Sequence, residues 1–91
     1  MSRGKPKELD DLGLGTSAFK VLCYLSFESD PLRPSEIAEG LGEKASTVRA
    51  RLTELKSAGL VSATPDGYVS NLNPYDILMK LYRDIKEELR G

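Results

Sequence analysis

Hydrophobic residues recur with helical spacing between Lys44 and Leu60. Val48, Leu52 and Leu55 are separated by four and then three residues, so they fall on one face of an α-helix. The opposite face holds small and polar residues, namely Ser46, Ala50, Thr53 and Ser57. Gly59 ends the pattern, because glycine readily adopts the left-handed backbone found at helix C-termini. The pattern predicts a helix over residues 45–58 with one buried face and one small, polar face.

A second helical pattern covers residues 17–28 and is apolar around much of its circumference. Thr16 or Ser17 can cap its first turn, because a hydroxyl accepts a hydrogen bond from an unpaired backbone N–H. A helix with so little polar surface must be covered on two sides, by its own domain and by either the last helix or a second subunit. One apolar face consists of Ala18, Val21, Leu22 and Leu25, and the other of Phe19, Cys23 and Phe27.

A shorter helix is predicted between these two, in the segment PSEIAEGLG. Pro31 separates it from the preceding helix, and Pro34 suits its first turn, where a missing N–H costs nothing. Leu32 is expected in a very short strand, and Gly42 is expected to end the helix. Two short helices joined by a glycine-containing turn form a helix-turn-helix pattern.

The chain changes character after Gly59. Residues 60–64 and 68–72 are rich in Val, Thr and Tyr and are predicted to be strands. The four residues Thr64-Pro65-Asp66-Gly67 have the composition of a tight turn. We therefore expect a β-hairpin with Asp66 at its tip.

A last helix is predicted from Pro74 to about Arg90, capped by Asn73. Its length of roughly 25 Å follows from the 1.5 Å rise per residue. Its apolar stripe is expected to consist of Leu78, Leu81, Tyr82, Ile85 and Leu89, with Ile77 beside it. Its solvated side is expected to consist of Asp76, Lys80, Arg83, Asp84, Glu87 and Arg90.

The chain has 91 residues, of which 40% are hydrophobic and 30% charged, as expected for one soluble domain. No apolar run approaches the ~20 residues of a membrane span, and the first ten residues do not form a signal peptide. A cytoplasmic location and no contact with a membrane are expected. Gly4 and Pro6 interrupt residues 1–8, which are predicted to be a flexible basic arm.

The net charge of −1 argues against strong non-specific binding to nucleic acid, which depends on neutralising phosphates. The charge is distributed unevenly, however. Residues 44–56 contain four basic residues and one acid, Glu54. Local charge matters more than the total where a binding face is concerned.

Together these elements predict an α+β, mainly α fold. The segments LGLGTSAFKVLCYL, PSEIAEGLG and ASTVRARLTELKSAGLV, followed by the hairpin, resemble the winged helix-turn-helix of MarR, ArsR and TrmB regulators from archaea and bacteria. The resemblance covers residues 9–72, the expected DNA-binding domain, and residues 73–91 would be a dimerisation helix. It implies a transcription regulator that binds double-stranded DNA, with the helix at 45–58 as recognition helix and the hairpin as wing.

The expected DNA-binding residues divide into three groups. Residues predicted to face base edges are Ser46, Thr47, Arg49, Ala50 and Thr53. Residues predicted to lie nearer the phosphates are Lys44, Arg51 and Lys56. Positioning contacts are expected from Arg33 and Ser35, beside unpaired N–H groups at a helix N-terminus, and from Tyr68 at the base of the wing.

Two features depart from the family pattern. Lys44 stands where a Ser or Thr cap is common, and the wing tip carries an acid, Asp66, where Arg or Lys is common. A second interpretation is therefore a winged helix that mediates protein–protein contacts or assembly without reading DNA.

The chain has no histidine and a single cysteine, so we expect neither an enzyme, nor a metal site, nor a cofactor. The sequence does not indicate whether an effector binds.

A homodimer is expected from the apolar surface left over on the first and last helices. Pairing these helices across a two-fold axis would bury that surface and match a palindromic DNA site. The alternative is a monomer in which the last helix folds back onto the first. The expected interface residues are Phe19, Cys23, Phe27, Leu78, Leu81, Tyr82, Ile85 and Leu89.

Overall fold

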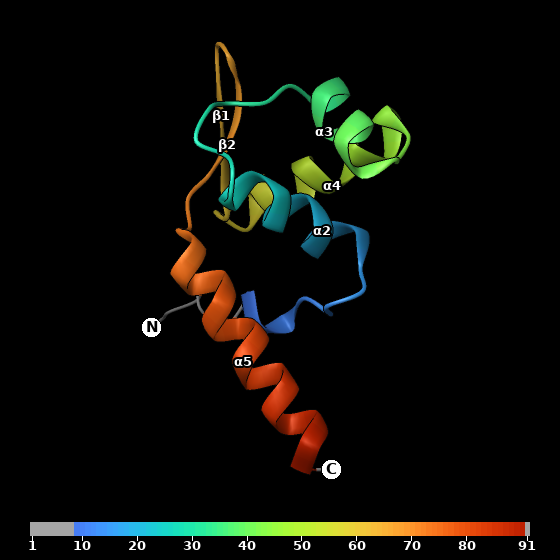
Figure 1. Ribbon diagram of the computed structural model, residues 1–91. Coiled ribbons are helices and arrows are strands. Elements are labelled where there is room, and N and C mark those ends of the chain that lie inside the picture. The colour runs from blue at the N-terminus through green and yellow to red at the C-terminus, as the bar shows by residue number, and fades with distance from the viewer. Residues whose placement is uncertain (1–8, 91) are drawn as a thin grey trace.

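The computed structural model describes residues 9–90 of the chain, so the predicted basic arm at residues 1–8 lies outside the described residues. Residues 9–11 are helical and lead into the main body of the domain. The elements that follow are the helices α2 (Ser17–Ser26), α3 (Pro34–Leu41) and α4 (Ala45–Ser57), the strands β1 (Val61–Thr64) and β2 (Gly67–Ser70), and the helix α5 (Pro74–Arg90) (Figure 1). This order confirms the predicted winged helix-turn-helix, with a mainly helical α+β fold.

The predicted caps are present. Thr16 Oγ1 accepts a hydrogen bond from the Phe19 N–H at 3.2 Å, which starts α2. Asn73 Oδ1 accepts one from the Asp76 N–H at 2.9 Å, which starts α5. Gly59 has a φ of +80°, so it provides the left-handed residue after α4 that the sequence predicts. Helix α2 ends at Ser26, earlier than predicted, and both strands are shorter than predicted.

The core lies where α2, α3 and α4 meet. Leu22, Ile37 and Leu52, one from each helix, have no exposed surface. The predicted inner face of α4 is buried in full, because Val48 and Leu55 are also at most 2% exposed. The same packing leaves the polar face of α4 at the surface.

The hairpin is antiparallel, with Val61 opposite Ser70 and Thr64 opposite Gly67. Leu32 forms the very short third strand that the sequence predicts. It donates a backbone hydrogen bond to the carbonyl of Tyr68 at 3.0 Å and accepts one from the Tyr68 N–H at 2.7 Å. The wing is therefore held to the segment between α2 and α3.

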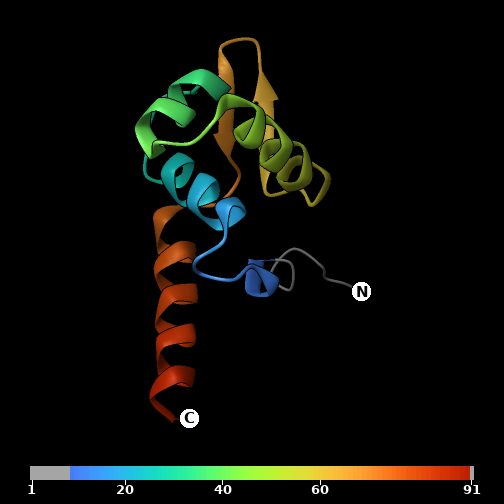
Figure 2. The same cartoon turned by 90° about the vertical axis from the view of Figure 1, so that its right-hand side faces the viewer.

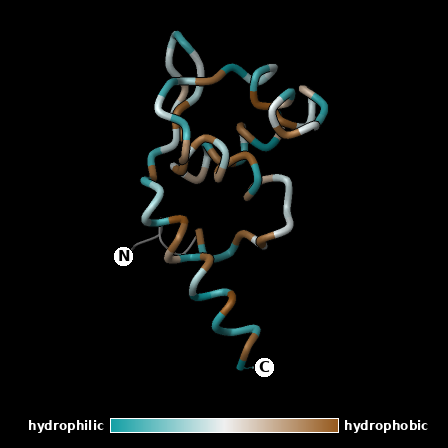
Figure 3. The backbone as a smooth tube through the Cα atoms, viewed as in Figure 1, coloured by the Kyte–Doolittle hydropathy of each residue, from teal (hydrophilic) through white to brown (hydrophobic). Residues whose placement is uncertain are grey.

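Helix α5 leaves the domain at the base of the hairpin and extends away from it (Figures 1 and 2). In Figure 2, α5 and α4 lie on opposite sides of the domain. Hydrophobic positions recur along α5 to its C-terminal end, beyond the part that lies against the domain (Figure 3). Most of the apolar surface of this helix is therefore not used in packing the domain.

Two predictions about these helices are wrong. Lys80, expected on the solvated side of α5, is completely buried, with Nζ 2.8 Å from Asp84 Oδ2 and 5.6 Å from the centre of the Phe19 ring. Phe19, expected in a dimer interface, is only 4% exposed because it packs inside its own domain. Leu81 is half-buried against the core and offers less free surface than expected.

Candidate nucleic-acid interface

The outer face of α4 is the centre of the candidate interface. Ser46, Arg49, Ala50 and Thr53 are all exposed, as predicted. The Thr53 hydroxyl donates a hydrogen bond to the carbonyl of Arg49 at 3.0 Å, so it lies against the helix backbone. Thr47 is half-buried and less accessible than the sequence suggests. Arg49 is the one long side chain on this face, and the others are short.

Two exposed lysines stand at the ends of α4. Lys44 is the N-cap residue and Lys56 lies in the last turn. The first turn of α4 contains no acidic residue, and its N-cap makes no side-chain hydrogen bond to the helix. The partial positive charge of the helix N-terminus is therefore reinforced by Lys44.

Arg51 is less free than predicted. Its guanidinium Nη2 lies 2.8 Å from Glu54 Oε2, and the side chain is half-buried. Glu54 thus partly neutralises the charge of Arg51, which the sequence predicts to contact a phosphate. Arg49 and the two lysines carry most of the free positive charge of α4.

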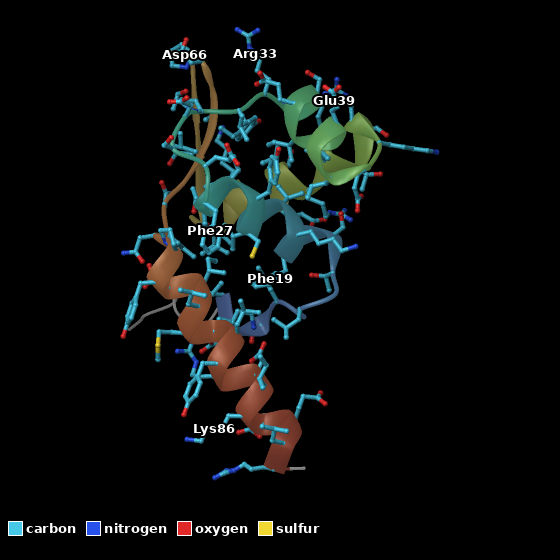
Figure 4. All side chains as sticks on the ribbon, in the orientation of Figure 1. Phe19, Phe27, Arg33, Glu39, Asp66 and Lys86 are labelled. Atoms are coloured by element: carbon cyan, nitrogen blue, oxygen red, sulfur yellow. The ribbon has the colours of Figure 1, made fainter. Side chains whose placement is uncertain are left out.

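The N-terminus of α3 presents Arg33 and Ser35, both exposed. The carboxylate of Glu36 accepts a hydrogen bond from the Arg33 N–H at 2.7 Å, so an acid already occupies this helix end. A phosphate there would meet that carboxylate, which makes this N-terminus less suitable than predicted. Figure 4 shows the Arg33 side chain extending outward between the wing tip at Asp66 and Glu39 of α3.

The wing is anchored to the C-terminal end of α4 by a residue that the sequence analysis missed. Asn71 Nδ2 donates a hydrogen bond to the carbonyl of Gly59 at 3.0 Å, and Asn71 Oδ1 accepts one from Ser62 Oγ at 2.9 Å. Tyr68, predicted to contact DNA, is half-buried and packs against the core. Tyr68 therefore fixes the wing, and the exposed wing tip is Pro65 and Asp66.

Cys23 lies on α2 in a shallow apolar groove of about 370 Å³ that is also lined by Tyr24, Phe27 and Leu41. Burial raises the pKa of its thiol above the ordinary value.

Within residues 9–90 there is no cluster of three or more His, Cys, Asp or Glu side chains that could hold a metal ion. Over the same residues, no helix has the length and apolar character needed to cross a membrane.

Comparison with curated proteins and with solved structures finds no match. Residues 17–65 match the IclR helix-turn-helix domain, a segment that runs from α2 through β1 and includes all of α4. The general prediction of a DNA-binding helix-turn-helix of the transcription-regulator type is confirmed. The match is not to the MarR, ArsR or TrmB groups, which are different helix-turn-helix families. Because the match covers slightly more than half of the sequence, the chain belongs to the IclR helix-turn-helix domain family.

Proposed function

We propose that the protein is a cytoplasmic transcription regulator that binds a specific double-stranded DNA sequence as a homodimer, with α4 in the major groove. The observation that carries this proposal is the outer face of α4, where Arg49 stands among Ser46, Ala50 and Thr53. The major groove is about 12 Å wide and admits an α-helix. Small outward side chains let the backbone of that helix approach the bases closely.

Arg49 is the residue best placed to discriminate between bases. An arginine that donates two hydrogen bonds to the edge of a guanine contributes ~1–3 kcal/mol of discrimination against other bases. Arg49 is exposed at the middle of α4, and none of the ion pairs found in residues 9–90 includes it. Thr53 and Ala50, beside it, would add apolar contacts with base edges.

Phosphate contacts would come from the ends of the same helix. Lys44 and Lys56 are exposed there, and the first turn of α4 carries no acid. The net charge of −1 predicts weak binding to arbitrary DNA, since that binding depends on neutralised phosphates. Affinity for the correct site would then depend more than usual on base contacts.

The test is a gel shift of the full chain on random duplex at low salt, followed by selection from a randomised duplex library. We expect a weak shift on random duplex and enrichment of one sequence motif. A weak shift without enrichment would contradict sequence-specific binding. No shift under either condition would contradict DNA binding and favour a winged helix that binds other proteins.

A further inference from the structure

Helix α5 exposes five large apolar side chains in a regular order. Their positions are separated by three, four, three and four residues, which is the spacing of the a and d positions of a heptad repeat. The exposed fractions are 66% for Tyr75, 53% for Leu78, 58% for Tyr82, 50% for Ile85 and 84% for Leu89. We call these five residues the α5 seam.

The α5 seam is separate from the face of α5 that packs against the domain. That inner face contains Ile77 and Lys80, which are completely buried, and the half-buried Leu81. At about 100° per residue, the seam is centred roughly 130° around the helix from the inner face. Among the described residues, the inner face of α5 therefore packs against the domain, and the α5 seam is uncovered.

We propose that the α5 seam binds the α5 seam of a second copy of this chain, forming a short two-stranded coiled coil. The proposal rests on the homodimer of the proposed function and identifies its contact surface. It keeps the exposed α5 residues of the interface predicted from the sequence, without Phe19, which is buried, and Leu81, which belongs to the inner face. The first helix is not needed for this contact.

A second copy fits the α5 seam for two reasons. A heptad stripe is complementary to an identical stripe, since the knobs of one helix enter the holes of the other. The buried area is also large enough for a specific dimer. Five large side chains, each at least half exposed, would bury on the order of 500 Å² per copy, or ~1,000 Å² in total, which is the lower limit for a specific interface.

The positions beside the α5 seam favour the same partner. Lys86 and Glu88 flank it with opposite charges, so pairing two copies does not concentrate charge of one sign. The seam spans only about two heptads, so we expect a dimer that dissociates on dilution. A coiled coil this short is stabilised further when both copies bind one DNA site.

The test is sedimentation velocity of the full chain without DNA, at concentrations up to tens of micromolar. The wild type should approach twice the 10.0 kDa mass of the chain. The double variant Tyr82→Glu, Ile85→Glu should remain a monomer at every concentration, because it places charges at the centre of the α5 seam. Circular dichroism should show that this variant keeps the helix content of the domain.

Glu87→Lys is the matched control, because Glu87 is exposed on α5 outside the seam. It should dimerise like the wild type. A wild type that stays monomeric throughout, or a double variant that dimerises like the wild type, would overturn the proposal. Neither result depends on DNA, so failure of the α5 seam is distinguishable from failure of DNA binding in the gel shift.

Discussion

Lys80 Nζ donates a hydrogen bond to Asp84 Oδ2 at 2.8 Å, and this lysine has no exposed surface. Its only other hydrogen bond among the described residues is a long one, 3.4 Å, to the carbonyl of Asp10. The Phe19 ring lies on another side of the ammonium group, at 5.6 Å from its centre. The pair therefore connects α5 both to α2 and to the segment before it.

The two partners of this pair should not be equally sensitive to substitution. Asp84→Ala leaves a buried ammonium group without its carboxylate and should lower the free energy of unfolding by about 2–4 kcal/mol. Lys80→Met keeps the volume of the side chain and leaves Asp84, which is 32% exposed, to be solvated by water. It should cost about 1 kcal/mol or less. Urea unfolding measures both values. If Lys80→Met destabilised the protein as much as Asp84→Ala, or more, the unequal roles of the two residues would be contradicted.

The burial of Lys80 shows what the sequence pattern can and cannot predict. The periodicity of apolar residues located both faces of α4 correctly, because that helix packs along a single face. The same reasoning placed Lys80 in solvent, because its burial depends on Phe19 and Asp10, which are distant in the sequence. The α5 seam was only partly found, because Tyr75 was not counted and Leu81 was.

Only parts of the candidate interface could be predicted from the sequence. The exposed face of α4 follows from helical spacing alone. The Arg51–Glu54 pair, three residues apart, could have been anticipated as a common helix pair. The role of Asn71 could not be anticipated from the sequence, because only the hairpin brings its partners Gly59 and Ser62 close to it.

Gly67 should be essential for the wing. It has a φ of +139°, and a Cβ at this position would lie 2.6 Å from the carbonyl carbon of Leu32. Gly67→Ala should therefore destabilise the domain by about 1–3 kcal/mol or more, through backbone strain and the clash with Leu32 together. Gly15→Ala is the control, because a Cβ at Gly15 meets nothing within 4 Å. Thermal unfolding of the two variants checks this, and equal melting temperatures would contradict both the strain at Gly67 and its close contact with Leu32.

Cys23 should react slowly in the folded protein. Burial raises the pKa of its thiol, so less of the reactive thiolate is present at a given pH. Alkylation by iodoacetamide at pH 8 should be slower in buffer than in urea, where the chain is unfolded. The difference should shrink as the pH rises and the folded thiol ionises. Equal rates in buffer and urea at pH 8 would mean that Cys23 is not protected by the fold.

DNA binding should depend only moderately on salt. Each copy presents four exposed cations on or near the proposed interface, namely Arg33, Lys44, Arg49 and Lys56. Each neutralised phosphate contributes about −0.9 to the slope of log affinity against log salt, so a dimer, with twice these cations, should give a slope no steeper than about −7. Fluorescence anisotropy titrations over a range of salt concentrations measure this slope. A steeper value would require phosphate contacts from elsewhere in the chain.

If the outer face of α4 reads bases, Arg49→Ala should reduce the discrimination between two duplexes. The measurement is the ratio of affinities for the selected DNA sequence and a scrambled duplex, at one salt concentration. Lys56→Ala is the comparison, and it should weaken both duplexes alike and leave the ratio unchanged. Arg49→Ala should lower the ratio about five- to a hundredfold, because a lost guanine contact costs ~1–3 kcal/mol and ~1.4 kcal/mol is tenfold. An unchanged ratio in Arg49→Ala would contradict base reading by α4.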